Sequence, residues 1–553
     1  MKKIYKISAL LTALVFTSGC NKYLDINSNP AVPQVVKAEI LLPPMQFQMA
    51  NGTGQDYERA VSKLTQNMAG VVNDDVAYIW ERQGYVGSSD VSGVMWRMTY
   101  YDLGINLENM IKDAVANQKW EYAGIGYAMK AWAYQTTTDA YGPIVLDEAF
   151  TPNQLTFHYQ DQPVVYQRVR EWVDQAIRYF NMTDPSPSPA ASLAVLATGD
   201  NIYRGDKTKW KKFCYGLLAL QYGHLVNKPN FPTALADSVT KYADLSFTSV
   251  SDDATIYFTA SNVADANPFG VLNAPKLNSG WLSATGSQAS YYGRQTTTIL
   301  KMLTGGIKGT ATPSPTTSLD PRFSRFLTPG TTAATTSPIY VGVTPGLFTP
   351  TNVPPILGQL ATGTTVGYNG KYMFTDRARY PIMTYAELQF IKAEAQFIKS
   401  GATVAYPTYT NAIRATFDFY NTYGRTQATP DLVIAAADIT AYMTSSEVAQ
   451  SAATLTKSDI MQQKYIALWG WGGIETWCDL RKYHYDPLIY PNFSLPTSPS
   501  ALPLSATNGG KMSYRLRPRY NSEYVWNLAE LAKFGGDLSN YNTQEMWFSL
   551  TTP

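Results

Sequence analysis

One group of acidic residues in the sequence lies among aromatic side chains: Asp74, Asp75 and Glu81 stand beside Tyr78 and Trp80. Two carboxylates suffice for glycoside hydrolysis, because one acts as a general acid while the other serves as base or nucleophile. With 42 acidic residues in the chain, some such pairing arises by chance. A surface hydrolase that uses this group is therefore an alternative, and the main prediction is that the chain has no catalytic residue.

The other common signatures of catalysis and metal binding are missing from the sequence. It contains no HExxH, CxxC, G-x-S-x-G or G-x-x-x-x-G-K-[ST] pattern. The three histidines, His158, His224 and His484, have no sequence neighbour with the spacing of metal ligands. The glycine-rich stretch 305–310 differs in spacing from a phosphate loop and is interpreted as a turn. We therefore expect no enzyme activity, no metal and no cofactor.

The aromatic residues favour binding over catalysis. Sugars present C–H faces that stack on aromatic rings, and a tyrosine adds a hydroxyl group to such a ring. The chain has 12 Trp and 39 Tyr residues, and two stretches without helical periodicity, 73–85 and 281–294, combine aromatic with polar side chains. We predict that both stretches are loops that bind a ligand, although their rings alternatively only fix the loops to the scaffold. The candidate ligand-binding residues are Tyr78, Trp80, Trp281, Tyr291, Tyr292 and Arg294.

Two further sets of residues are expected to have structural roles. Glu475, Asp479 and Arg481 lie together on one predicted helix, where we interpret them as members of internal ion pairs. Cys214 lies in an apolar helical stretch, so we expect Cys214 and Cys478 to be buried free thiols. A disulfide between these two cysteines is the alternative.

The N-terminus has the pattern of an export signal followed by a lipidation site. Three lysines precede an apolar run over residues 7–16, which is too short to remain as a membrane-spanning helix. Ser18 and Gly19 are small and are followed at once by Cys20, the order that a lipoprotein signal peptidase requires. We predict that residues 1–19 are removed as a signal peptide and that Cys20 carries lipid. An ordinary signal peptide with a chance cysteine is the alternative.

The charge balance argues against nucleic acid as a partner. Without residues 1–19 the chain loses three of its 44 basic residues and none of its 42 acidic residues, which leaves 41 basic and 42 acidic side chains. A net charge of −1 gives no excess of basic residues with which to bind nucleic acid. No later segment reaches the roughly 18 apolar residues that a membrane-spanning helix needs. The expected membrane contact is therefore the lipid on Cys20.

Paired helices are expected to position the two aromatic loops. The clearest helix starts at Thr384, where Thr384 and Glu387 form a capping box, and it ends before Gly401. Small residues inside the helices allow close approach of backbones, as in tetratricopeptide-type hairpins. The predicted pairs are 122–138 with 164–180, 210–226 with 233–242, and 384–401 with 406–420, and further helical segments cover 57–72, 94–115 and 457–482.

The chain between the second and third helix pairs has a different character. It is rich in Thr, Ser, Gly, Pro and Asn, and so long an irregular segment in a compact protein is usually functional. We therefore predict one domain that combines a helical scaffold with an irregular ligand-facing region. The predicted lipidated tether covers residues 20–44 and ends in Pro43-Pro44. A single domain is predicted to follow over residues 45–553. Its scaffold lies at about 45–242 and 380–486, its irregular region at about 246–375, and its C-terminal segment at 487–553.

Motifs along nearly the whole chain resemble those of the SusD/RagB-like outer-membrane lipoproteins. Each motif is weak alone, and their order and spacing carry the resemblance. Two turns depart from the family pattern, since Pro143 replaces its Asp and Asn521 replaces its Pro. The motifs are the lipidation site at Cys20, Leu24-Asp25-Ile26-Asn27 with Asn29-Pro30, Asp139-Ala140-Tyr141-Gly142-Pro143-Ile144, Trp210-Lys211-Lys212-Phe213, Tyr385-Ala386-Glu387-Leu388 with Ala393-Glu394-Ala395, Gln463-Lys464-Tyr465-Ile466-Ala467-Leu468-Trp469-Gly470, and Arg519-Tyr520 with Glu523 and Asn527.

The resemblance implies a mainly α fold, in which tetratricopeptide-like helical hairpins carry a large irregular ligand-binding region. It also implies a non-catalytic receptor on the cell surface, anchored to the outer membrane by lipid. Such a receptor captures an oligosaccharide or polysaccharide and closes like a lid on a SusC-like TonB-dependent transporter. The same importer role with peptides as cargo is an alternative, and so is a helical scaffold that binds only proteins. The family offers no common ligand motif, so the candidate binding residues depend on local chemistry alone.

Overall fold

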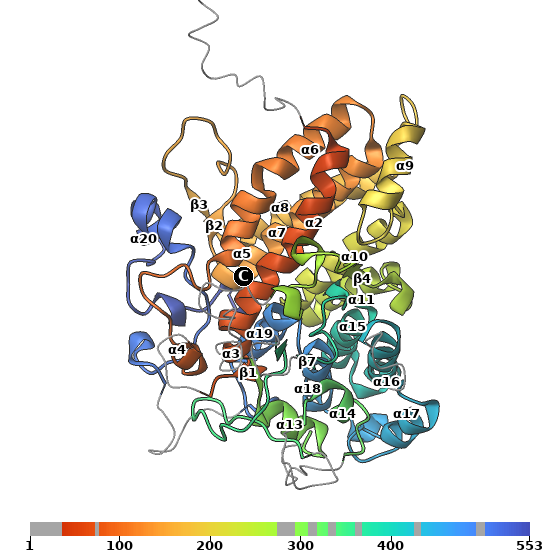
Figure 1. The fold of residues 1–553 in the computed structure, drawn as a ribbon, viewed down its shortest axis with the longest axis vertical. Coiled ribbons are helices and arrows are strands. Elements are labelled where there is room, and N and C mark those ends of the chain that lie inside the picture. The colour runs from red at the N-terminus through yellow and green to blue at the C-terminus, as the bar shows by residue number, and fades with distance from the viewer. Residues whose placement is uncertain are drawn as a thin grey trace, which may run out of the picture.

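The chain is mainly helical, with short strands between the helices (Figure 1). The predicted signal segment, Cys20, and the loop residues Trp281, Tyr291 and Tyr292 lie outside the described part of the chain. The computed structural model describes residues 36–71, 77–273, 293–307, 318–329, 339–359, 368–424, 433–493 and 504–552.

The first predicted helix pair is confirmed. It consists of α7 (Trp120–Tyr141) and α8 (Gln162–Phe180), which pack along each other. A Cβ atom at Gly124 of α7 would lie 2.6 Å from the ring of Phe180 in α8, closer than such atoms ever approach. A glycine inside a helix costs about 1 kcal/mol. The close packing of the two helices offsets this cost.

The second and third predicted pairs are also confirmed. The second is α10 (Lys207–Gly223) with α11 (Ala236–Leu245), and the third is α15 (Tyr385–Ser400) with α16 (Ala402–Phe419). A short turn at Gly401, with φ of 81°, joins the helices of the third pair. Because this φ lies in the left-handed region, glycine suits the position better than any other residue.

The capping box predicted at the start of α15 is present. The Thr384 hydroxyl accepts a hydrogen bond from the Glu387 backbone N–H at 3.2 Å, and the Thr384 N–H donates to the Glu387 carboxylate at 3.1 Å. Two backbone donors at the helix start are thereby satisfied. Glu387 is 2% exposed, so this cap lies in the protein interior.

The N-terminal helix corrects the predicted end of the tether. Helix α2 (Ala38–Asp56) includes Pro43 and Pro44, at which the predicted tether ends. A proline inside a helix costs about 3 kcal/mol, because it lacks an N–H group and crowds the preceding turn. Leu42 and Met45 are buried on either side of the proline pair. Their burial, as part of the face of α2 that packs on other helices, outweighs the proline penalty.

The helical unit predicted over residues 457–482 consists of two helices. Helix α18 (Lys457–Leu468) and helix α19 (Gly473–Lys482) are separated by a turn at Gly470, whose φ is 90°. At the start of α19, a Cβ on Gly473 would lie 2.2 Å from the ring of Tyr57. These glycines therefore permit both the break between the helices and the contact with the N-terminal part of the chain.

The remaining elements are shorter. The helix predicted over 57–72 ends at Leu64, and the helix predicted over 94–115 contains a π-helical segment at Met98–Gly104. Four antiparallel strand pairs are present in the described residues: β1 (Met68–Ala69) with β5 (Arg294–Gln295), β2 (Ile144–Val145) with β3 (Tyr159–Gln160), β4 (Ala254–Ile256) with β8 (Tyr380–Met383), and β6 (Gly358–Gln359) with β7 (Tyr368–Asn369). The other helices are α3 (Ser62–Leu64), α4 (Ala77–Glu81), α5 (Val94–Arg97), α6 (Ile105–Ala116), α9 (Ala190–Gly199), α13 (Thr297–Leu303), α14 (Phe323–Phe326), α17 (Ala436–Met443) and α20 (Leu528–Ala532).

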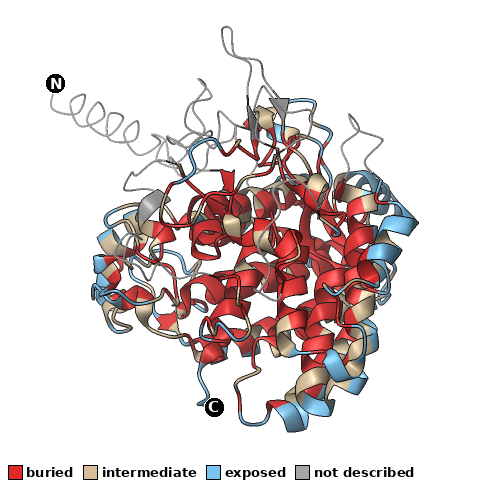
Figure 2. Cartoon of the chain, turned by 90° about the horizontal axis from the view of Figure 1, so that it is seen from below, coloured by how far each residue is buried: buried red, intermediate tan, exposed pale blue. Residues whose placement is uncertain are grey.

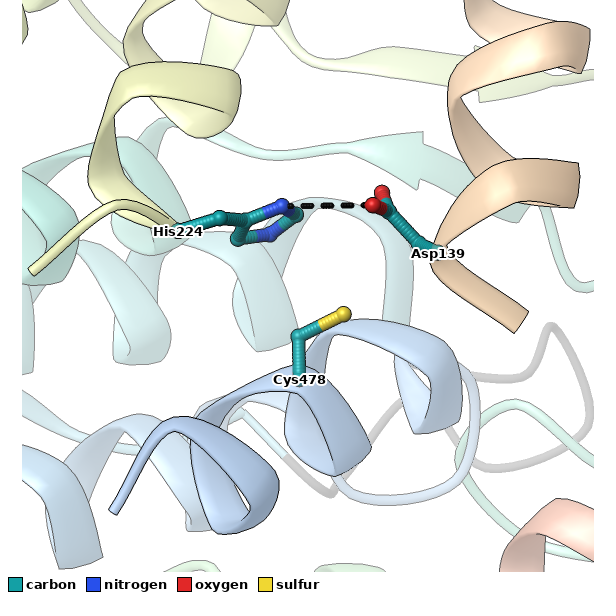
Figure 3. Close-up of side chains that lie close together, drawn as sticks. All are labelled: Asp139, His224 and Cys478. Carbon is teal, nitrogen blue, oxygen red and sulfur yellow. Dashed lines mark ion pairs between the residues drawn. The ribbon is translucent and has the colours of Figure 1, made fainter. Parts of the chain in front are cut away.

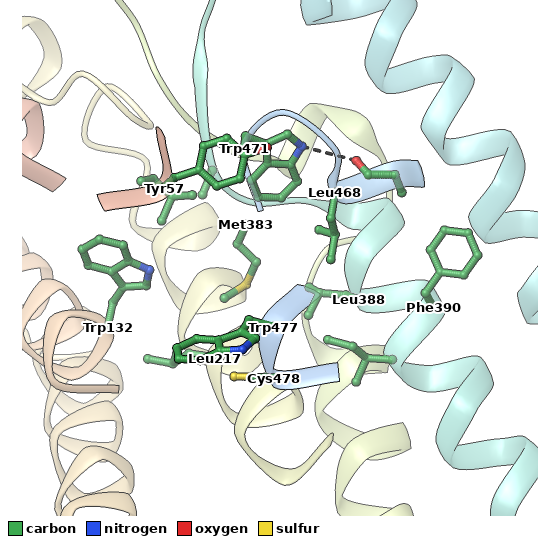
Figure 4. Packing of buried hydrophobic residues seen from close by; sticks show 14 of the residues in the cluster. Tyr57, Trp132, Leu217, Met383, Leu388, Phe390, Leu468, Trp471, Trp477 and Cys478 are labelled. Atoms are coloured by element: carbon green, nitrogen blue, oxygen red, sulfur yellow. Dashed lines mark hydrogen bonds between the residues drawn. The ribbon is translucent and has the colours of Figure 1, made fainter. Parts of the chain in front are cut away.

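Buried residues fill the centre of the molecule, and exposed residues lie at its periphery (Figure 2). In the core, Trp471, Met383 and Trp477 come from separate elements and lie close together (Figure 4). Cys214 and Cys478 are buried free thiols, as predicted. Burial raises the pKa of both thiols. Within the described part of the chain, no helix has both the length and the apolar character needed to cross a membrane.

A buried arginine attaches the irregular region to the helical scaffold. Arg322 is fully buried and forms an ion pair with Asp320 at 2.7 Å. It also donates hydrogen bonds to Thr416 of α16 at 3.2 Å, Tyr442 of α17 at 3.1 Å and Gln463 of α18 at 3.0 Å. One guanidinium group thus joins three helices to the irregular region, and its planar arrangement of five donors makes arginine suited to this role.

Candidate functional site

The residues that precede the first predicted aromatic loop pair with those at the end of the second in one small sheet. Strands β1 and β5 are antiparallel, with Met68 opposite Gln295 and Ala69 opposite Arg294. Isolated bridges add a third segment, because Thr296 pairs with Val343 and Arg294 pairs with Pro355. We call residues 68–71, 293–297 and 341–355 the loop platform.

The antiparallel pairing places the ends of both loops together. The chain leaves β1 through Val71, and it enters β5 through Gly293. In an antiparallel pair, the end of one strand lies beside the start of the other. The last described residue after β1, Val71, and the first described residue before β5, Gly293, therefore belong to the same edge of the loop platform. Within the loop platform, Ala69, Val343 and Val353 form a small apolar cluster separate from the main core.

Glu81 has a structural role in this platform. It is 2% exposed, and its carboxylate accepts hydrogen bonds from the backbone N–H groups of Gly70 at 2.6 Å and Gly346 at 2.7 Å. Charge-assisted bonds of this kind are among the stronger hydrogen bonds in proteins. Glu81 therefore joins α4 to two segments of the loop platform. Because the Glu81 carboxylate is engaged in these hydrogen bonds, it does not fit the catalytic role that the alternative of a surface hydrolase would give it. Asp74 and Asp75, the other members of this acidic group, lie outside the described residues.

Two of the predicted ligand-binding residues are buried. Trp80 is 0% exposed, because the segment predicted as a loop contains α4, which directs this ring into the core. Arg294 is 7% exposed, and its guanidinium donates to the Val353 carbonyl within the platform. The predicted ligand contacts of Trp80 and Arg294 are therefore wrong in this structure. The Tyr78 side chain and residues Trp281, Tyr291 and Tyr292 lie outside the described part, where their role stays a prediction.

Three potential metal ligands meet in the core, although the sequence shows no such spacing. Atoms of Asp139, His224 and Cys478 lie within 4.8 Å of one another (Figure 3). His224 Nδ1 is 3.6 Å from the Asp139 carboxylate and 3.1 Å from the Tyr166 hydroxyl, while Nε2 is 2.7 Å from Glu475. Burial alone would lower the pKa of His224, but the Glu475 and Asp139 carboxylates outweigh it and raise this pKa well above the usual value. His224 is thereby part of a buried network of ion pairs and hydrogen bonds.

This ion network includes Glu475 and Asp479, which were predicted to form internal ion pairs. Lys464 is fully buried and lies 2.6 Å from Glu475 and 2.9 Å from Asp479, while Lys482 lies 2.8 Å from Asp479. The prediction of internal ion pairs is confirmed for both acids. For Arg481 the structure shows a different role from the predicted ion pair. Its guanidinium stacks 3.8 Å from the centroid of the Trp477 ring and donates hydrogen bonds to backbone carbonyls.

The buried carboxyl group of Glu387 gives the protein a testable pH dependence. Burial, followed by the nearby Glu475 carboxylate, raises the pKa of Glu387 from 4.5 to about 8. Between these pH values the folded chain holds a proton that the unfolded chain has released, so stability falls as the pH rises through this window. Glu387→Gln keeps the capping box, since glutamine also serves at this position. We expect the variant to lose this part of the pH dependence.

The measurement for this prediction is the free energy of unfolding in urea across the same pH window. The difference between Glu387→Gln and the wild type isolates the contribution of Glu387 from that of other groups. Glu171→Gln, at a position whose side chain is 51% exposed, is the control and should follow the wild-type profile. Parallel profiles for wild type and Glu387→Gln would contradict the prediction.

The arrangement of paired helices with an irregular region attached to one side defines a SusD-like fold. Residues 30–516 match the model of a SusD-like family that is described as starch-binding and associating with the outer membrane. Because the match covers most of the chain, this protein belongs to that SusD-like family. A comparison with curated proteins gave no match.

Solved structures agree with the fold. A chitin-binding protein aligns with a TM-score of 0.68 and 19% identity, covering 93% of this chain and 100% of its own. A SusD/RagB family protein from Bacteroides thetaiotaomicron aligns with a TM-score of 0.65 and 21% identity, covering 94% and 100%. A chitin-binding SusD homolog from Flavobacterium johnsoniae aligns with a TM-score of 0.63 and 16% identity, covering 93% and 99%. At these identities the likeness establishes the fold.

Proposed function

We propose that this protein is a non-catalytic nutrient-binding lipoprotein of the cell surface that captures an oligosaccharide or polysaccharide. The observation that carries the proposal is the loop platform in a chain of a starch-binding family: Val71 and Gly293, which lead into the two aromatic stretches of the sequence, belong to one edge of it. Two of the structural neighbours are named as chitin-binding, so chitin fragments are candidate ligands beside starch fragments. Both are neutral polymers whose sugar rings stack on aromatic side chains.

The proposed ligand-binding residues are Tyr78, Trp281, Tyr291 and Tyr292. Tyr78 belongs to α4, and Trp281, Tyr291 and Tyr292 precede Gly293 of the loop platform in the sequence. Trp80 and Arg294 take a supporting role, because they are buried at the base of these loops. A rigid base with loops that carry the binding residues is a common arrangement in binding proteins.

Trp281→Ala tests the proposed site. We expect the wild type to bind either maltooligosaccharides or chitooligosaccharides in calorimetry, and the variant to bind the same ligand roughly tenfold more weakly, because one stacking ring is lost. Trp526→Ala is the matched control, since Trp526 is 73% exposed and lies in the C-terminal segment outside the loop platform. If wild type and Trp281→Ala bind the glycan with equal affinity, Trp281 does not contact the ligand. If the protein binds peptides and no glycan, the proposed cargo is wrong, and the proposed role in import then applies to peptides.

The delivery step of the proposal depends on Cys20 and on a partner. We propose that lipid on Cys20 holds the chain at the outer membrane and that a SusC-like TonB-dependent transporter receives the glycan. The family description, which names association with the outer membrane, supports this location. Since α2 begins at Ala38, the tether proposed between the lipid and the folded domain covers residues 20–37. Recovery of the transporter with the detergent-solubilised protein would test the partnership.

A further inference from the structure

Three hollows lie next to one another around the π-helical segment Met98–Gly104. Their volumes are about 470, 480 and 450 Å³. The first and second share Tyr100 and Tyr101, the second and third share Ile105 and Phe150, and the first and third share Ala149. We call the surface formed by these three hollows the Tyr101 groove. None of its lining residues belongs to the loop platform, and Figure 1 shows α5 and α6, which flank the π-helical segment, away from β1.

The π-helical segment explains why an aromatic ring stands at the centre of this groove. Met98 is 0% exposed and faces the core, whereas Tyr101, three residues later, is 71% exposed. The wider turn shifts the direction of successive side chains, and such segments occur frequently at functional sites. The segment ends at Gly104, whose φ of 24° suits glycine, and a Cβ there would lie 3.3 Å from the Phe150 ring. Glycine therefore lets the loop that carries Phe150 approach the segment.

The charged groups along the groove already have partners. Arg97 pairs with Asp102 at 3.2 Å, and Arg519 pairs with Asp90 at 3.0 Å. The Glu523 carboxylate accepts from the Trp96 indole at 3.2 Å and from the Tyr159 hydroxyl at 2.6 Å. In the third hollow, Lys130 pairs with Glu108 at 2.5 Å and Asp147 with Arg168 at 2.5 Å. Four balanced ion pairs and one hydrogen-bonded carboxylate attract neither a cation nor an anion strongly, so the groove favours a neutral ligand.

Aromatic and polar groups are combined along the groove. Trp96, Tyr100 and Phe157 line the first hollow, together with Ser522. The Arg97 guanidinium lies 5.1 Å from the centroid of the Tyr101 ring, which restrains the orientation of this exposed side chain. Tyr101 has an exposed ring, and Tyr100 and Phe157 have partly exposed rings. Such rings beside hydroxyl and guanidinium groups match the two faces of a sugar, its C–H surface and its hydroxyls. Each hollow has the volume of a site for one small molecule, about 300–1,000 Å³.

We propose that the Tyr101 groove is a second glycan-binding site, which holds a further stretch of the same neutral polysaccharide chain. Three connected hollows fit an extended ligand with repeating units better than one compact molecule. This inference depends on the proposed glycan capture and adds a second site to it. Two sites on one protein raise the apparent affinity for a long chain above that for a short one, because the second contact becomes intramolecular.

Tyr101→Ala tests this inference with minimal risk to folding, since the side chain is exposed. A short oligosaccharide should bind the wild type at two places in calorimetry and the variant at one. The affinity for a long polysaccharide should fall about tenfold or more as the second contact is lost. Tyr101→Phe, which keeps the ring, should restore both results. Tyr257→Ala removes a partly exposed ring outside the groove and should bind like the wild type.

The outcomes separate this inference from the proposed function. If the wild type binds no glycan, the proposed function fails and the inference fails with it. If the wild type binds glycan, Trp281→Ala weakens binding and Tyr101→Ala does not, then only the inference is overturned. If Tyr101→Ala leaves glycan binding unchanged and instead weakens association with the transporter, the groove is a protein-docking surface, which also overturns the inference.

Discussion

Lys464→Met is expected to destabilise the protein by about 3–5 kcal/mol. Lys464 is 0% exposed and forms ion pairs with Glu475 and Asp479, which are also buried. Methionine has a similar length but no charge, so the variant leaves two carboxylates near each other without their shared cation. His224 and Lys482 remain as partners of these carboxylates, but one of the buried cations that balance them is lost. Removing one member of a buried ion pair costs far more than the pair contributes. The measurement is the free energy of unfolding in urea at neutral pH.

The chain offers controls for this expectation. Lys533 forms an exposed ion pair with Glu530, and Lys533→Met should change stability by less than about 1 kcal/mol. Adding Glu475→Gln to Lys464→Met should recover part of the lost stability, because it removes the repulsion between the two carboxylates that had shared Lys464. A loss below about 1 kcal/mol for Lys464→Met would show that the network rearranges or takes in water. That result would contradict the network as described.

The ion network also links elements that are distant in the sequence. Glu475 lies between Lys464 of α18 and His224, which follows α10, while Lys482 reaches Glu394 of α15 at 2.8 Å. Hydrogen bonds and charges in the interior are stronger than in water, and unpaired groups there are costly. The network therefore favours one arrangement of these helices over alternatives with similar apolar burial. Its members on α15, α18 and α19 hold together the part of the scaffold to which Arg322 attaches the irregular region.

The helix pairs could be predicted because their signals are local. The capping residues Thr384 and Glu387 and the stop at Gly401 lie within the helix that they define. Apolar periodicity and small residues gave the other pairs in the same way. Helix α2 could not be predicted, since Pro43 and Pro44 argue against a helix and only packing against distant helices stabilises it. The same holds for α4, a turn of helix too short for a periodic pattern.

At the candidate site, the features that the sequence does not predict depend on contacts between segments far apart in the chain. The sequence identifies Trp80 as an aromatic residue in a polar stretch, but its burial depends on neighbours that the sequence does not place. The pairing of Ala69 with Arg294 joins segments more than two hundred residues apart, and no local pattern indicates it. The same applies to the cluster of Asp139, His224 and Cys478, which comes from three separate helical regions.

Cys20→Ala is expected to release the protein from the membrane while leaving its glycan affinity unchanged. The acyl chains proposed on Cys20 contribute about 0.8 kcal/mol for each methylene group that enters the bilayer, and the variant lacks all of them. Ligand affinity should be preserved, because α2 begins at Ala38 and the proposed binding loops lie further along the chain. Fractionation of cells and calorimetry of the purified variant measure the two effects.

Glycan uptake by cells should also fall in Cys20→Ala, because capture and transport then occur on molecules that are no longer held at the same surface. Residues 21–37 reach at most roughly 60 Å when fully extended. A lipid link of this reach would confine the protein to the membrane surface, where the proposed transporter also lies. Cys214→Ala is the matched control, since this buried thiol lies in the folded domain and its loss should leave membrane retention intact. Membrane retention or full uptake in Cys20→Ala would show that the lipid is dispensable for delivery.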